Sequence, residues 1–339
     1  MHIEKCNIAL YISHMEKTNW IGFDLGGTKM LALAFDEKFK EIGRSRRKTK
    51  ASEGMKAGLC RIVETIEETL TEAKVSKESI AGIGIGVPGP LDHREGVIID
   101  APNLGWKDMP LKKTLAKAFG CDVVVVNDVD AGVYGEYSFG AAQGAHCALG
   151  VFPGTGIGAG CVYRGQLIQG SVNSCMELGH IPVLPEGPIC GCGKRGCLEA
   201  VASRLAISAA VAAEAFRGHG PTILRECGTD ISNIRSKALA QSIAAGEKAV
   251  EDIVRQAARW LGRGVATAMN LFAPDIVVLG GGLVEAMPEL YIEEVKKSAT
   301  AIAMPAYAGM VRFTKAKLGD DATAMGAAAW ARAEVRSVS

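Results

Sequence analysis

One local pattern occurs twice in this chain and restricts the folds that it can adopt. A short apolar segment, a turn rich in Gly and Thr, and a second apolar segment follow one another at 19–36, and the same order returns at 147–163. The two turns lie about 127 residues apart. A supersecondary unit repeated at this spacing predicts two domains of similar topology. The length of 339 residues agrees with two domains.

Predicted strands and helices alternate through the chain, which indicates α/β architecture. Apolar residues at helical spacing predict an amphipathic helix over 54–74, with Ser52 as its N-cap. The segment 123–126 is apolar throughout, which is typical of a strand in the middle of a sheet. Further strands are predicted at 80–87, 97–99 and 276–279, and further helices at 110–119, 247–272 and 321–335.

Charge and composition argue against several classes of protein. The 38 basic and 37 acidic residues leave a net charge of +1, so neither a basic nucleic-acid-binding face nor attraction to anionic membranes is expected. No apolar run approaches the ~18 residues of a membrane span. The first 20 residues fit no signal peptide, so we expect a cytoplasmic protein with reduced cysteines. Residues 1–14 are expected to be a dispensable extension or the result of a start codon assigned too early.

Three glycine-rich turns, each after an apolar strand, suit the binding of a nucleotide. In the turns at 26–29 and 154–156, bare backbone N–H groups and a Thr hydroxyl can approach phosphate closely. Asp24 ends the first strand and can orient Mg²⁺ or its water shell. The glycines at 280–282 leave backbone against which a flat ligand can lie. A single turn of this kind can be a plain hairpin, but three favour a ligand site.

Two common nucleotide-binding motifs do not account for these turns. The phosphate-loop pattern GxxxxGK[ST] is absent from the sequence. A GxGxxG pattern occurs at Gly84, Gly86 and Gly89, but Pro88 and Pro90 interrupt it and no helix is expected to follow. We therefore reject a dinucleotide-binding fold.

One histidine and three cysteines have the composition of a structural zinc site. Cys190, Cys192 and Cys197 lie within eight residues, and His180 precedes them by ten. Three thiolates and an imidazole make a closed tetrahedral set for Zn²⁺. The alternative is that these cysteines are unpaired small apolar residues.

Polar residues near these turns are candidates for catalysis. Asn127 and Asp128 follow the apolar strand at 123–126, and a carboxylate in this place can be a general base. Asp128 could instead cap the following helix. Glu177 and Glu199 flank the histidine and cysteines, as ligand-binding groups or as solvated surface acids.

Taken together, these motifs resemble the ROK family of sugar kinases and repressors from about residue 19 to the last helix. The resemblance rests on DLGGTK at 24–29, APNLGW at 101–106, ND at 127–128, ELGH at 177–180, CGCGKRGCLE at 190–199 and GGG at 280–282. It implies two ribonuclease-H-like domains, as in hexokinase, actin and the 70-kDa heat-shock chaperones, with ATP and sugar in the interdomain cleft. The expected domains are 19–132 with 320–335, and 133–319, which includes a zinc-binding loop at 171–199.

The resemblance also assigns roles to residues of this chain. It makes Asp128 the catalytic base. It assigns the sugar hydroxyls to Asn103, Asn127, Glu177, His180 and Glu199. It assigns zinc to His180, Cys190, Cys192 and Cys197. It assigns ATP and its Mg²⁺ to Asp24, Gly26, Gly27, Thr28, Lys29, Gly154, Thr155, Gly156, Gly280, Gly281 and Gly282.

The family contains both enzymes and regulators, and the sequence favours an enzyme. Repressors of the family carry an added N-terminal DNA-binding region of roughly 60 residues, whereas 18 residues precede the first predicted strand here. We expect ATP-dependent phosphorylation of a hexose at its 6-hydroxyl, most simply glucose, by a homodimer or homotetramer. N-acetylhexosamine, mannose and fructose remain alternative substrates.

Overall fold

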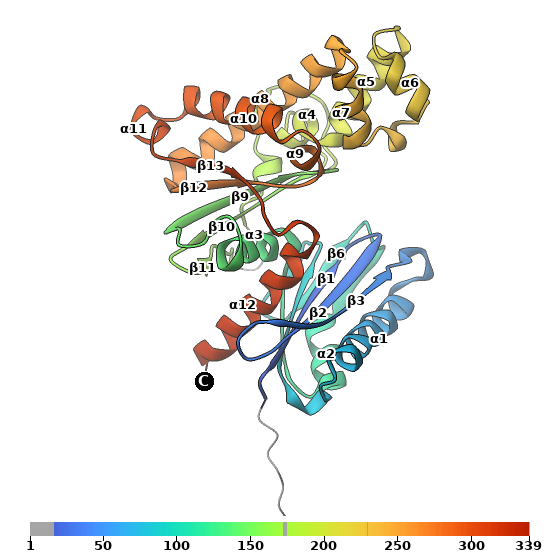
Figure 1. Ribbon diagram of the computed structural model, residues 1–339, viewed down its shortest axis with the longest axis vertical. Helices are drawn as coiled ribbons and strands as arrows, with labels where there is room; N and C mark the ends of the chain where they lie inside the picture. Colours follow the sequence, from blue (N-terminus) through green and yellow to red (C-terminus); the bar gives the residue numbers. More distant parts are fainter. Residues whose placement is uncertain (1–16, 172–174, 229, 339) are drawn as a thin grey trace, which may run out of the picture.

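The chain folds into two lobes, which lie one above the other in Figure 1. The computed structural model describes residues 17–171, 175–228 and 230–338, so the expectation for residues 1–14 lies outside the described part. Each lobe is built on one five-stranded sheet. No helix of the described residues is long and apolar enough to cross a membrane.

The first sheet has the strand order β3-β2-β1-β4-β8. Strands β1 to β3 pair antiparallel, whereas β4 and β8 run parallel to β1. The strands are β1 (Asn19–Leu25), β2 (Lys29–Phe35), β3 (Glu41–Lys48), β4 (Ile80–Val87) and β8 (Asp122–Asn127). A small second sheet follows β4 and consists of β5 (Leu91–Asp92), β6 (Val97–Ala101) and β7 (Trp106–Pro110).

The sheet of the second lobe repeats this arrangement, with the order β11-β10-β9-β12-β13. Its first three strands pair antiparallel and its last two run parallel to β9. The strands are β9 (Cys147–Pro153), β10 (Ile157–Tyr163), β11 (Gln166–Leu167), β12 (Ile276–Leu279) and β13 (Arg312–Lys315). The two sheets of like topology confirm the fold class that the repeated turn predicted.

Helices cover both faces of the first sheet. Helices α1 (Met55–Ala73) and α2 (Leu111–Phe119) pack on one face, and α12 (Ala322–Val338) crosses β1 and β4 on the other. A Cβ atom on Gly84 would lie 1.9 Å from the carbonyl oxygen of Ala327, so only glycine lets α12 approach the sheet this closely. Helix α3 (Asp128–Phe139) packs on α12 and on β10 of the second lobe.

Two local expectations were wrong. The apolar strand β8 lies at the edge of its sheet, not in the middle. Its side chains are apolar because α2 and α12 cover its two faces. Ser52 lies in a short 3-10 helix, Ala51–Glu53, and Gly54 precedes α1 at a φ of 85° without a side-chain cap.

The second lobe carries most of the helices, and α8 forms the longest of them. The core between its sheet and helices is apolar and includes Leu149, Val254, Leu261 and Val277. The helices are α4 (Leu198–Ala202), α5 (Arg204–Phe216), α6 (Pro221–Cys227), α7 (Ser236–Ala244), α8 (Lys248–Phe272), α9 (Gly282–Ala286), α10 (Pro288–Ile302) and α11 (Pro305–Ala308).

Candidate active site

The carboxyl ends of β1 and β8 bring two acidic residues together between the lobes. Asp24 lies next to the end of β1, and Asp128 follows β8 directly. Since β1, β4 and β8 run parallel, their carboxyl ends meet at one edge of the sheet. Both acids line a pocket of about 430 Å³, which Gly281 and Gly282 line from the second lobe. We refer to it as the glycine pocket.

Asp128 is the first residue of α3, and its neighbour is the cap. The Asn127 side-chain oxygen accepts hydrogen bonds from the N–H groups of Val129 (2.9 Å) and Asp130 (3.2 Å). The Asp128 carboxylate accepts one hydrogen bond, from Val129 N–H at 2.9 Å. Because Asn127 caps the helix, the Asp128 carboxylate is left to face the pockets.

Burial favours the protonated form of both acids. Burial, with the Asp128 charge as the next contribution, raises the pKa of the Asp24 carboxyl to about 7. Burial also raises the pKa of Asp128 above its usual range, and Glu177 adds to this shift. Carboxyl groups with raised pKa values in a cleft are typical of proton-transferring sites.

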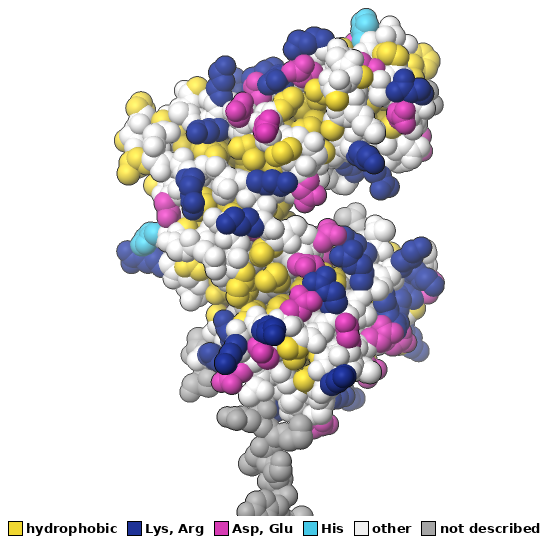
Figure 2. Space-filling view, in the orientation of Figure 1, with side chains coloured by type: hydrophobic (Ala, Val, Ile, Leu, Met, Phe, Trp, Pro, Cys, Tyr) yellow, Lys and Arg dark blue, Asp and Glu magenta, His cyan; other side chains and the backbone are white. Residues whose placement is uncertain are grey.

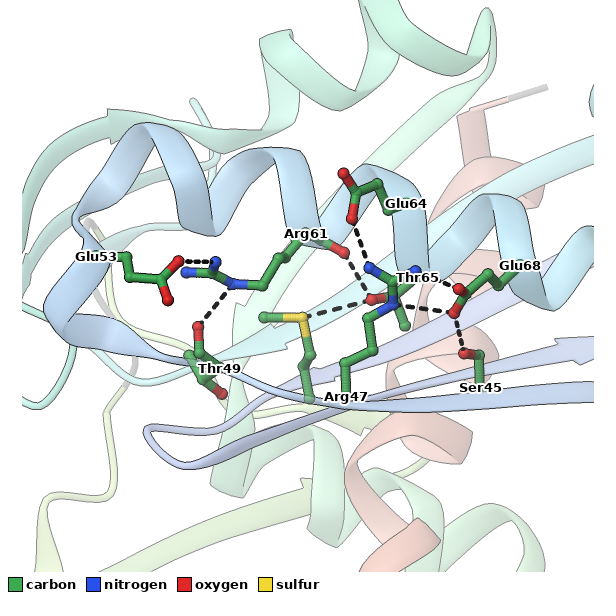
Figure 3. A network of polar contacts seen from close by, with 9 residues as sticks. Ser45, Arg47, Thr49, Glu53, Arg61, Glu64, Thr65 and Glu68 are labelled. Carbon is green, nitrogen blue, oxygen red and sulfur yellow. Dashed lines mark hydrogen bonds and ion pairs between the residues drawn. The ribbon is translucent and has the colours of Figure 1, made fainter.

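The first Gly/Thr turn is fixed by hydrogen bonds within its strand pair and from β3. Gly26 N–H donates to the Lys29 carbonyl at 3.0 Å, and the Thr49 hydroxyl donates to the Gly26 carbonyl at 2.6 Å. Thr49 is itself placed by α1, because its carbonyl accepts a hydrogen bond from Arg61 at 2.9 Å (Figure 3). Glu68 on the same helix binds Ser45 and Arg47 on β3. These contacts hold the turn against α1.

The second Gly/Thr turn closes in the same way and adds a positive charge. Gly154 N–H donates to the Gly156 carbonyl at 2.8 Å. The Thr155 hydroxyl accepts a hydrogen bond from the Arg204 guanidinium at 2.8 Å. The sequence analysis did not identify Arg204, which is 49 positions away from Thr155.

A second pocket, of about 630 Å³, adjoins the glycine pocket and is rich in carboxylates. Asp128, Val129 and Phe152 line both pockets. We refer to it as the carboxylate pocket. Its other lining residues include Asn127, Gly154, Gly156, Glu177, His180 and Glu199.

The histidine and three cysteines expected to bind metal do come together. The ligand atoms of His180, Cys190, Cys192 and Cys197 all lie within 4.8 Å of one another. Cys192 and Cys197 sulfurs are 3.7 Å apart, and Cys190 Sγ is 3.6 Å from His180 Nδ1. Tetrahedral Zn²⁺ with ordinary bond lengths places two sulfurs about 3.8 Å apart, and sulfur and nitrogen about 3.6 Å apart. The four side chains therefore fit a tetrahedral metal ion.

This metal cluster adjoins the carboxylate pocket through two side chains. With His180 Nδ1 directed to the cysteines, His180 Nε2 lies 4.0 Å from the Glu177 carboxylate. The Glu199 carboxylate accepts a hydrogen bond from Ile157 N–H at 2.9 Å, and its other oxygen lies 3.7 Å from Cys190 Sγ. A bound metal would thus fix the direction in which His180 faces the pocket.

Comparison with known proteins decides the family. The sequence model of the ROK family matches residues 20–334 of the chain. The chain belongs to the ROK family. It is 34% identical to a glucokinase of Thermotoga maritima, over 93% of this chain and 97% of that protein. It is also 26% identical to a xylose repressor of Caldicellulosiruptor bescii, over 90% of this chain and 76% of the repressor.

Solved structures of ROK proteins share the fold. A ROK glucokinase from Streptomyces griseus, in complex with glucose and AMPPNP, superimposes with a TM-score of 0.79 at 30% identity, over 93% of this chain and 99% of that one. A ROK hexokinase from Thermus thermophilus gives a TM-score of 0.79 at 35% identity, over 94% and 99% of the two chains. Both are sugar kinases by name.

Ten of the 20 predicted site residues of this ROK protein line the two pockets; residues 26–29, Asn103, Thr155, Gly280 and the three cysteines do not. Asn103 lies outside the carboxylate pocket, beside Gly27, in an exposed turn between β6 and β7. Lys29 is directed to Asp320, with 2.5 Å between Nζ and the carboxylate. Gly280 is buried against the Phe152 ring, and the two glycines that follow it line the glycine pocket.

Several residues of the pockets were missed by the sequence analysis. Phe152 lies between the two pockets, and Asp320 and Thr323 line the glycine pocket from the segment before α12 and its first turn. The Thr323 hydroxyl donates to the Asp128 carbonyl at 3.1 Å across 195 residues. No local pattern marks such contacts. The position of Phe152, two residues before the second Gly/Thr turn, was the one available signal.

Proposed function

We propose that this ROK protein transfers the γ-phosphoryl group of ATP to the 6-hydroxyl of a hexose, with glucose as the main acceptor. The observation that carries the proposal is the place of Asp128, which lines both pockets. The glycine pocket then binds the phosphate donor, and the carboxylate pocket binds the sugar. The reacting hydroxyl and the γ-phosphate meet beside Asp128.

Asp128 acts as the general base. Its carboxylate accepts the proton of the 6-hydroxyl as that oxygen attacks the γ-phosphorus, and the bond to the leaving ADP oxygen breaks in line. The raised pKa of Asp128 supports this role, because a base with a pKa nearer to the working pH accepts a proton more readily.

The carboxylate pocket holds the sugar ring so that only one hydroxyl reaches Asp128. Glu177 and Glu199 accept hydrogen bonds from ring hydroxyls, and His180 Nε2 and the Asn127 amide supply further polar groups. The Asn127 amide nitrogen is available for this purpose because the helix cap uses only the side-chain oxygen. Asn103 joins this set only if the two lobes close, since it lies outside the pocket here.

Two metal ions support these residues. Asp24 and Asp320 in the glycine pocket offer carboxylate oxygens that suit Mg²⁺, which neutralises phosphate charge when bound. The His180 and cysteine cluster suits Zn²⁺, which is structural because its four ligands leave no open position. The turns at 26–29 and 154–156 would hold the phosphates through N–H groups other than those of Gly26 and Gly154, which close the turns.

Residues 19–132 with 320–335, and residues 133–319, are proposed to act as two domains that close on the substrates. Closure would exclude water and limit ATP hydrolysis. Assembly into a homodimer or homotetramer is part of this proposal. The free cysteines of this cluster support a reducing, cytoplasmic location, and a 6-phosphorylated glucose product would enter glucose breakdown.

A kinase assay across hexoses tests the proposal. Formation of ADP and of sugar phosphate would be measured with glucose, mannose, fructose, N-acetylglucosamine and N-acetylmannosamine, each with ATP and Mg²⁺. Glucose should give the highest kcat/KM and a 6-phosphate product. A protein that binds a sugar but turns over none would instead be a sugar sensor of the repressor type.

A further inference from the structure

Two guanidinium groups lie near the second Gly/Thr turn without an acidic partner. Arg204 is bonded to the turn twice: its N–H donates to the Gly154 carbonyl at 2.9 Å, and its guanidinium donates to the Thr155 hydroxyl at 2.8 Å. Within the ranges that the structure describes, no Asp or Glu forms an ion pair with Arg204 or Arg235. Arg217, just past the end of α5, differs in this respect, because it forms an ion pair with Glu214.

The positive charge of Arg235 acts on Arg204. Burial and the neighbouring charge of Arg235 lower the pKa of Arg204. Two like charges without a counter-ion raise the electrostatic energy of the folded chain, and an anion between them removes that cost. The pair is therefore suited to a ligand that carries negative charge.

Arg235 approaches the glycine pocket through the residue that follows it, although neither arginine lines that pocket. Arg235 directly precedes Ser236, whose hydroxyl lies 3.3 Å from the point that a Cβ on Gly282 would occupy. Ser236, Lys237 and Gly282 line a groove of about 510 Å³, which shares Gly282 and Glu285 with the glycine pocket. Figure 2 shows Lys and Arg side chains along the edge of the upper lobe that faces the hollow between the lobes.

We propose that Arg204 and Arg235 bind the phosphate chain of the donor, which supplies the negative charge that the protein lacks at this point. The inference rests on the proposed kinase function and adds two donor-binding residues to it. Guanidinium groups bind phosphate oxygens through paired, charge-assisted hydrogen bonds. Thr155 positions Arg204 for this contact through its hydroxyl. A nucleoside triphosphate and inorganic tripolyphosphate share the chemistry that the pair recognises.

The test compares charge removal with charge retention at one position. Arg204→Gln should raise the KM for ATP by about 10- to 100-fold, the range for loss of one hydrogen bond to a charged group, and leave the KM for glucose within twofold. Arg204→Lys should recover part of the loss. Arg235→Gln should also raise the KM for ATP. Arg217→Gln, at the far end of α5, is the matched control and should change neither constant.

Direct binding separates this inference from the kinase proposal. Calorimetry measures the binding of AMPPNP and of tripolyphosphate without turnover. Arg204→Gln should bind both ligands more weakly, and its affinities should depend less on salt concentration than those of the parent chain. If Arg204→Gln weakens the binding of AMPPNP but not of tripolyphosphate, the site is specific for nucleotides. AMPPNP affinity within twofold of the Arg217→Gln control, in variants with unchanged melting temperature, would overturn the inference even if hexose is phosphorylated. Weakened binding without any hexose kinase activity would overturn the kinase proposal and leave the inference standing.

Discussion

Glu136 joins the two segments through which the chain passes between the lobes. Its carboxylate, fully buried near the end of α3, accepts hydrogen bonds from Ala141 N–H (2.7 Å) after that helix. It also accepts hydrogen bonds from Lys317 N–H (2.8 Å) and Leu318 N–H (2.7 Å), on the way back from β13 to α12. One side chain therefore fixes both crossings, and we expect it to stabilise the pairing of the lobes.

The cost of changing Glu136 follows from these three bonds. A buried donor left without an acceptor costs ~1–3 kcal/mol. Glu136→Gln keeps one oxygen, which can serve Lys317 and Leu318, and should lower the free energy of unfolding by ~1–3 kcal/mol. Glu136→Ala strands all three donors and should cost at least ~3 kcal/mol.

Urea unfolding followed by tryptophan fluorescence measures these changes, because Trp20, Trp106 and Trp330 are buried on the first sheet and its helices. Glu64→Gln is the control: Glu64 is exposed and pairs with Arg47, so its loss should cost less than ~1 kcal/mol. The reasoning is refuted if Glu136→Ala unfolds within ~0.5 kcal/mol of the parent chain.

Three further changes test the site. The parent chain should carry about one zinc ion by elemental analysis, because four ligands make a single tetrahedral set, and Cys192→Ser should lose it. The affinity for sugar should then fall more than the affinity for ATP; unchanged sugar affinity without metal would contradict this. Glu199→Gln should lower kcat/KM for glucose by ~10-fold and leave the KM for ATP unchanged, and kcat/KM for a deoxyglucose that lacks the bound hydroxyl should fall by a similar factor. Equal rates for all deoxy sugars would disprove that the pocket holds the ring hydroxyls. Asp24 has a pKa of about 7 when folded against 3.8 unfolded, so the folded parent chain binds more protons and loses stability as pH rises from about 4 to about 7. Asp24→Asn lacks this loss, so without Mg²⁺ its stability relative to the parent should increase across that range; a constant difference from pH 4 to 8 would be evidence against the raised pKa.

Features that are close together in the sequence could be predicted, and contacts between distant segments could not. The repeated turn predicted two sheets of one topology, since each turn and its strands are contiguous. The grouping of His180 with three cysteines could be predicted because the cysteines lie within eight residues of one another. The contacts of Glu136 and Arg204 were not predicted, because their partners lie 181 and 49 positions away in the sequence. No periodicity marks such pairs. The edge position of β8 was missed because covering helices make both faces of a strand apolar wherever it lies.

Asp128 provides the most direct test of the account, which makes it the base that activates the sugar hydroxyl. The measurement is the rate of glucose 6-phosphate formation by Asp128→Asn with saturating ATP, Mg²⁺ and glucose, beside calorimetric affinities for glucose and AMPPNP. The account predicts a fall in kcat of ~10²-fold or more, with both affinities kept within a few-fold. Turnover within a few-fold of the parent chain would show that Asp128 is not the base, and would contradict the central claim.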